Sequence, residues 1–259
     1  MKSRSLLCLL TLFAATAFIS TPAFASLPDP ATKNQVPPIA FVQGMIWKRL
    51  DLADFTLNGT VRCDKTKKNY PIILRTKGHE LVYEFQDQPL QIRVQLNPGA
   101  FTIQKRSSSS GSWADLSSAE MGQSILGTDI TYEDLVVDFV NWDDIQPLGT
   151  DSIKTLPAYV FEAKPGPNDH SRFASVRFWV SKQYWAFLRV DGCNAKGQTT
   201  KRVEVQNVME IASSKPGGAK FYVFKEMKVA NMVPDKDDIA SSTTFIDIDD
   251  GKEGSGLTQ

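Results

Sequence analysis

The chain has 259 residues, and its 29 basic and 29 acidic side chains give a formal net charge of zero. A chain this close to neutrality lacks the concentrated basic face that nucleic-acid binding requires, and it lacks the charge for tight electrostatic docking to anionic lipid head groups. Its length suits one large domain.

The first 25 residues have the features of a secretory signal peptide. Lys2 and Arg4 form a short positive region, an apolar run follows from Leu6 to Ile19, and small residues flank Phe24 at the expected cleavage point after Ala25. The apolar run is shorter than the roughly 20 residues that span a bilayer. Cys8 lies too far upstream of the cleavage point to carry a lipid anchor. We therefore expect an exported protein that is soluble in the periplasm.

The next segment changes from a helical to a strand pattern. Residues Ile39–Leu50 place apolar side chains at helical spacing directly after two prolines, which predicts a short amphipathic helix. From Asp54 onward the apolar residues recur at every second position, as in half-buried strands separated by tight turns. The expected strands of this antiparallel meander are Phe55–Cys63, Pro71–Thr76, Glu80–Gln86, Leu90–Leu96 and Ala100–Lys105.

The middle of the chain interrupts this pattern. Ser107–Ser112 has the composition of a flexible linker. Two capping boxes follow, Ser117-x-x-Glu120 and Thr131-x-x-Asp134, and they predict two short helices, the first ended by Gly127 and the second running to about Phe139.

The meander then resumes and continues almost to the end. The further strands are expected near Ile145–Leu148, Ala158–Ala163, Ala174–Ser181, Trp185–Val190, Thr200–Glu210, Lys220–Val229 and Thr243–Asp247. Residues 26–250 are thus expected to form a single, mainly β domain of about 11–12 antiparallel strands, with one N-terminal helix and two inserted helices. Residues 251–259 form a polar tail that we expect to be disordered.

Residue patterns of catalysis or metal binding are missing. The chain has two histidines, His79 and His170, both in turn-rich stretches, and it has no CxxC or HxxxH spacing for zinc. Gly122–Gly127 does not follow the G-x-S-x-G pattern of a nucleophile elbow. The acidic stretch Asp247–Gly251 lacks the spacing and the final Glu of a calcium loop. We therefore expect neither an enzyme nor a cofactor or metal.

Two cysteines, Cys63 and Cys193, follow the expected cleavage point. Because the expected compartment is oxidising, a disulfide between them is favoured. Two free buried thiols are the alternative.

Several strands carry large apolar groups on one face, too many for three helices to cover as a solid layer. Such a sheet either closes around a filled core or curls around an apolar cavity that suits an acyl chain. Strand parity alone leaves both alternatives open. The candidate cavity residues are Leu81, Tyr83, Phe85, Ile92, Val94, Phe178 and Val180 from the strands, with Leu135 and Phe139 from the inserted helices.

Five stretches resemble one family in the same order along the chain. The segment Ser124–Leu135 (SILGTDITYEDL) resembles a segment of LolA-like outer-membrane lipoprotein-sorting proteins, and Arg177–Lys182 (RFWVSK) resembles their tryptophan-containing strand. The remaining stretches are Ala158–Pro165, the hairpin Leu188–Val205 and Thr243–Ile248. One departure occurs in the hairpin, where Asp191–Asn194 (DGCN) replaces the family's usual Tyr-Asp.

The resemblance implies a half-open antiparallel β-barrel with a helical lid over an apolar cavity. The expected hinges of the lid are Ser107–Ser112 and the region near Gly127. In that family the cavity takes acyl chains of lipoproteins or related lipids for transfer toward the outer membrane, which implies membrane-bound donor and acceptor proteins as partners. The alternative function is a periplasmic sensor or interaction module that uses the same cavity to regulate a partner protein.

Overall fold

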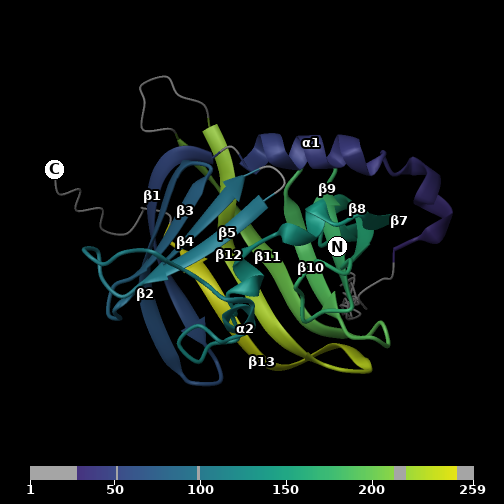
Figure 1. Ribbon diagram of the computed structural model, residues 1–259. Coiled ribbons are helices and arrows are strands. Elements are labelled where there is room, and N and C mark those ends of the chain that lie inside the picture. Colours follow the sequence, from purple (N-terminus) through teal and green to yellow (C-terminus); the bar gives the residue numbers. More distant parts are fainter. Residues whose placement is uncertain (1–27, 51, 98–99, 213–219, 250–259) are drawn as a thin grey trace, which may run out of the picture.

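The computed structural model describes residues 28–50, 52–97, 100–212 and 220–249 (Figure 1). The predicted signal peptide, residues 1–25, and the predicted tail, residues 251–259, lie outside the described residues. No helix in the described ranges is long and apolar enough to cross a membrane.

Thirteen strands of the described chain form one antiparallel sheet. They are β1 (Leu52–Cys63), β2 (Lys68–Gly78), β3 (Glu80–Phe85), β4 (Leu90–Asn97), β5 (Ala100–Arg106), β6 (Ala114–Asp115), β7 (Asp144–Ile153), β8 (Leu156–Lys164), β9 (Ser175–Ser181), β10 (Phe187–Cys193), β11 (Thr199–Ala212), β12 (Lys220–Val233) and β13 (Lys236–Ile248). The mainly β, antiparallel prediction is confirmed. The strand beyond the expected twelve is β6, a two-residue segment opposite Gln104 and Lys105 of β5.

The sheet consists of two meanders joined at one seam. The strand order is β6-β5-β4-β3-β2-β1-β13-β12-β11-β10-β9-β8-β7, so every neighbour is sequential except the pair β1 and β13. In that pair Val61 lies opposite Ile246. The edges β6 and β7 do not pair with each other, and the curled sheet therefore stays open, as expected for a half-barrel (Figure 1).

The N-terminal helix α1 (Ile39–Leu50) has the predicted bounds and lies across one end of the curled sheet (Figure 1). Val42 and Ile46 are buried against β7–β9, while Trp47 stacks on Phe101 of β5 with the ring centroids 5.2 Å apart. The helix therefore connects the two halves of the open sheet. A short 3₁₀ helix, η1 (Pro30–Gln35), precedes it beside β7.

The inserted helices are much shorter than predicted. The first is α2 (Ser118–Met121), and the second region contains two 3₁₀ turns, η2 (Glu133–Leu135) and η3 (Asp138–Asn141). The capping contact of α2 is present, since Ser117 N donates to Glu120 Oε2 at 2.9 Å, but the helix ends at Gly122 after one turn. In the second region, β-branched Val136 has extended backbone angles, which stops a continuous helix.

The predicted disulfide is wrong, because Cys63 and Cys193 are both free and buried. Cys63 lies in β1 and Cys193 in β10, with β13, β12 and β11 between them. Four strand spacings correspond to about 19 Å along the sheet, whereas a disulfide needs Cα atoms within about 7 Å. The Cys193 thiol instead contacts the Arg177 guanidinium, with Nη2 3.1 Å from the sulfur, and burial raises the pKa of this thiol.

A thiol count tests this correction. Denatured but unreduced protein that lacks the signal peptide should release two titratable thiols per chain, because both cysteines are shielded within separate parts of the sheet. A count of zero thiols would show that Cys63 and Cys193 form a disulfide, which is not possible with this strand order.

Candidate functional site

The concave side of the sheet is filled by the segment that joins its two edges. Residues 116–143, called here the crossing segment, connect the edge strands β6 and β7 and contain α2, η2 and η3. Since β6 and β7 lie at opposite ends of the strand order, this connection has to cross a face of the sheet. It lies on the concave side, between the two meanders (Figure 1).

A buried carboxylate fixes the first half of the crossing segment. Asp129 is 4% exposed, and its carboxylate accepts hydrogen bonds from Asn231 Nδ2 at 2.7 Å and from Thr244 Oγ1 at 2.9 Å, as well as from Ser242 Oγ. The Asp129 amide donates back to Thr244 Oγ1 at 3.0 Å. These partners belong to β12 and β13, so the crossing segment is tied to the seam side of the sheet.

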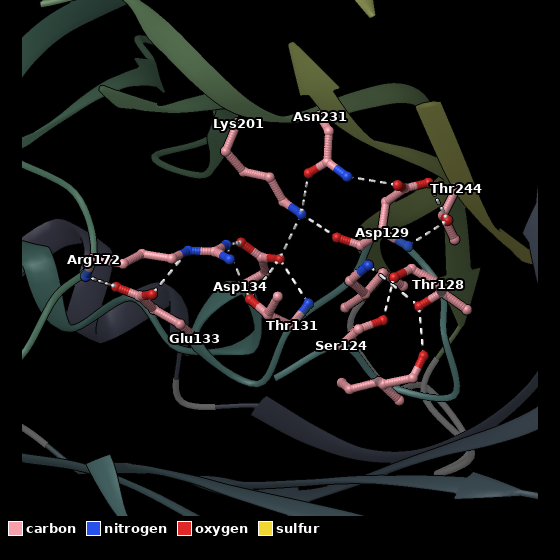
Figure 2. A network of polar contacts seen from close by, with 12 residues as sticks. Ser124, Thr128, Asp129, Thr131, Glu133, Asp134, Arg172, Lys201, Asn231 and Thr244 are labelled. Carbon is pink, nitrogen blue, oxygen red and sulfur yellow. Dashed lines mark hydrogen bonds and ion pairs between the residues drawn. The ribbon is translucent and has the colours of Figure 1, made fainter. Parts of the chain in front are cut away.

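A buried ion-pair network fixes the second half (Figure 2). Lys201 of β11 and Asp134 have side chains that are each 4% exposed, and Lys201 Nζ lies 3.0 Å from Asp134 Oδ2. The same Nζ donates to the Asp129 carbonyl and to Asn231 Oδ1. Arg172 binds the other side of the segment, with Nη2 3.1 Å from Asp134 Oδ1 and Nε 3.1 Å from Glu133 Oε2.

An apolar cavity of about 260 Å³ remains beside this network. It lies over β10, β11 and β12, between one packed cluster that covers β1–β5 and another that covers β7–β9. Its apolar lining is Tyr83, Met121, Leu135, Val136, Val137, Phe139, Trp142, Phe173, Val176, Phe187, Leu188, Val190, Val203, Val205, Phe224 and Met227. The cavity is therefore walled jointly by the sheet and by the crossing segment.

Polar groups line part of the cavity wall. Lys201 and Asp134 of the ion-pair network belong to the lining, as do Asp138 and His170. Burial raises the pKa of the Asp138 carboxyl. Among the described residues, no group of His, Cys, Asp and Glu could hold a metal ion. The cavity wall is therefore mainly apolar, with a few ionisable groups.

One glycine in the unusual DGCN stretch lets a loop close over the cavity. A Cβ atom on Gly192 would lie 2.4 Å from the Phe173 ring, so only glycine leaves room for this ring against β10. Both Gly192 and Phe173 line the cavity.

The structure separates the nine predicted cavity residues into two groups. Tyr83, Leu135 and Phe139 line the cavity. The others are packed into the two hydrophobic clusters and are absent from the lining, namely Leu81, Phe85, Ile92, Val94, Phe178 and Val180. Over β1–β5 the space is filled by Ile125, Ile130 and Tyr132 of the crossing segment. Over β7–β9, Phe178 and Val180 pack in the cluster that contains Phe139 of η3 and the buried side chains of α1.

The second half of the segment expected to act as a hinged lid is bonded to the sheet. Ile125 and residues 128–132 are buried, whereas Gly127, at the expected hinge, is exposed. The sequence contains one sign that this segment is bonded to the sheet, namely Lys201, which is not among the predicted cavity residues. By strand parity Lys201 shares a face with Val203 and Val205, and a charged residue on an apolar face needs a buried partner.

The Lys201→Met variant tests the role of the network. Removing one partner of a buried ion pair leaves an uncompensated charge and typically costs about 3–5 kcal/mol, and here Arg172 should keep the loss near the lower end. Urea denaturation should report this loss, and amide exchange should accelerate across residues 124–134. Lys105→Met is the control, since its partly exposed pair with Glu120 also ties the crossing segment to the sheet and should matter much less. Unchanged exchange in Lys201→Met would contradict an anchoring role.

A second variant tests the corrected position of the cavity. Ile92 is fully buried in the cluster over β1–β5, so Ile92→Glu should unfold the protein instead of merely blocking a cavity. Far-ultraviolet circular dichroism and thermal denaturation would report the change. A folded, stable Ile92→Glu protein would show that Ile92 lines a hydrated cavity and is not part of the packed core.

Solved structures of other bacterial proteins share this architecture. The DUF1329 family protein from Desulfovibrio piger is similar in structure, with a TM-score of 0.59 and 14% identity over 83% of this chain and 92% of that one. A domain described as outer membrane lipoprotein-sorting, from Vibrio parahaemolyticus, has a TM-score of 0.58 and 15% identity, with coverage of 82% and 92%. A LolA superfamily protein from Nitrosomonas europaea has a TM-score of 0.55 and 14% identity, with coverage of 83% and 93%.

At these identities the likeness concerns the fold. No curated protein matches the chain. A family model with the description "Uncharacterized protein" matches residues 108–250, more than half of the chain, beginning shortly after β5. The chain therefore belongs to the family that this model describes, and its fold is that of the LolA-like lipoprotein-sorting proteins.

Proposed function

We propose that the protein binds the acyl chains of a lipoprotein or related lipid in its apolar cavity and carries them through the periplasm toward the outer membrane. The observation that carries this proposal is the cavity itself, which is walled by apolar side chains from the sheet and the crossing segment. The LolA-like fold and its likeness to a domain described as lipoprotein-sorting support it.

The size and lining of the cavity suit an acyl chain. Its volume of about 260 Å³ lies just below the roughly 300–1,000 Å³ of typical ligand sites. Each methylene group moved from water into such a site contributes about 0.8 kcal/mol, so a chain can bind without any charged contact. The polar residues Asp138 and His170 at the wall would lie near the polar end of the ligand.

The predicted signal peptide supports the proposed periplasmic location. The predicted signal peptide, residues 1–25, would deliver the protein to the periplasm, where a carrier must exchange its ligand with membrane-bound donor and acceptor proteins. The cavity needs no catalytic group for this role, because the ligand is bound and released unchanged.

Native mass spectrometry of protein purified from its own periplasm tests the function. We expect a bound lipid at a defined stoichiometry, identified by its mass and fragmentation. Protein that carries no lipid and does not bind a fluorescent fatty-acyl probe afterward would contradict the proposal.

A cavity-filling variant tests the site. Val205→Phe should lower the affinity for a fluorescent fatty-acyl probe by tenfold or more, on the order of 1.4 kcal/mol, because the larger ring occupies ligand space while the wall stays apolar. The matched control is Val223→Phe in β12, at a half-buried position outside the cavity lining. Equal affinities of Val205→Phe, Val223→Phe and the unaltered protein would place the probe elsewhere.

A further inference from the structure

Aromatic side chains gather at the end of the sheet that α1 spans. Phe41 of α1 meets Trp185 edge to face, with the ring centroids 5.5 Å apart, and Trp185 also lies 5.9 Å from Tyr159 of β8. Beside them, Tyr184 and Tyr222 have ring centroids 5.4 Å apart. These five residues come from α1, β8, β12 and the turn between β9 and β10, and we call them the aromatic end.

This end holds most of the large apolar side chains that face solvent. Four such residues are exposed in the described ranges, and the first three are at or beside the aromatic end: Phe41 (53% exposed), Tyr222 (44%), Val208 (46%) and Ile239 (52%). Val208 pairs with Phe224, and Tyr222 pairs with Glu210. Residues two apart on a strand point to the same face, so Val208 and Tyr222 share one face of the sheet. Ile239 lies in the β12–β13 hairpin, at the other end of the strands.

Backbone geometry holds the aromatic end in place. Trp185 has a φ of 54°, in the left-handed region that bulky side chains rarely adopt. This conformation occurs in the tight turn between β9 and β10, where the indole ring contacts both Phe41 and Tyr159. The turn therefore fixes the indole ring at this end of the sheet.

The charges near the aromatic end are mainly basic. Lys48 is exposed and follows Phe41 by seven residues, so the two share a face of α1. Lys182 lies over the Tyr159 ring, with Nζ 4.9 Å from the centroid. The α1 sequence contains no acidic residue, and the acidic neighbour on the strands is Glu210, opposite Tyr222.

The aromatic end adjoins two strands that wall the cavity. Phe187 follows Trp185 by two residues in the chain, and Phe224 follows Tyr222 by two residues in β12; both phenylalanines line the cavity. A surface that binds at this end therefore lies next to the strands that wall the ligand site.

We propose that the aromatic end docks on the surface of a phospholipid bilayer. Tyrosine and tryptophan side chains, each apolar with a polar tip, together with nearby lysines, are the composition that favours the water–lipid interface. The proposal deepens the proposed function, on which it rests for its biological purpose, because docking brings the cavity beside the membrane that supplies or receives the acyl chain.

Vesicle flotation tests docking. Protein purified from the periplasm is mixed with vesicles of phosphatidylcholine, with or without phosphatidylglycerol, and the floated fraction is measured. Phe41→Glu and Tyr222→Glu should each lower the partition coefficient about tenfold or more, because each places a charge where an apolar ring entered the interface. Ile239→Glu is the matched control, equally exposed but at the opposite end, and it should float like the unaltered protein.

The outcomes separate docking from ligand binding. Phe41→Glu protein should still bind a soluble short-chain acyl probe, since Phe41 is not part of the cavity lining. Loss of probe binding in every protein, with flotation intact, would reject the proposed function and keep docking. Docking is rejected if the unaltered protein does not float, or if Ile239→Glu reduces flotation as much as Phe41→Glu. It is also rejected if light scattering shows a dimer that Phe41→Glu dissociates, since a second copy would then cover this end.

Discussion

The architecture depends on how an open sheet joins its two edges. Because β6 and β7 lie at opposite ends of the strand order, their connection crosses the concave face and must bury polar backbone inside an apolar shell. The Lys201–Asp134 ion pair and the Asp129 hydrogen bonds satisfy this requirement. Two charges lose their hydration there, which only close contact offsets. The network therefore fixes the crossing segment to β11–β13, and the same segment forms one wall of the cavity.

The other face of the same strands is fixed by a second ionic cluster, which gives the DGCN stretch a structural meaning. The Asp191 carboxylate is 1% exposed and accepts hydrogen bonds from Arg202 Nε and Nη2, both at 2.9 Å, and from Arg189 Nε at 3.0 Å. Burial raises the pKa of Asp191 to about 6 against the opposing effect of Arg189. Next to it, Gly192 makes room for Phe173 and Cys193 lies under Arg177. Strands β10 and β11 are thus fixed on both faces, which gives the cavity a firm floor.

The two packed clusters explain why the free space is modest. The first part of the crossing segment packs over β1–β5 with Ile125, Ile130 and Tyr132, and its last part, η3, packs together with α1 over β7–β9. The strip over β10–β12 keeps an unfilled volume of about 260 Å³. The curled sheet therefore combines both arrangements that strand parity allows, a solid core at its sides and a cavity between them. The aromatic end lies where this strip meets α1.

The sequence by itself determined the local features, because periodicity and turn chemistry depend on neighbours in the chain. The bounds of α1, the antiparallel strands and the shared face of Phe178 and Val180 follow from these patterns. Only the tertiary structure decided which strands adjoin β1 and β10, and hence that Cys63 and Cys193 remain apart. It also decided that Ile92 is core while Val205 lines the cavity. The physical reason is that both are apolar residues on strands of alternating pattern, and their roles differ only through what the crossing segment places above them.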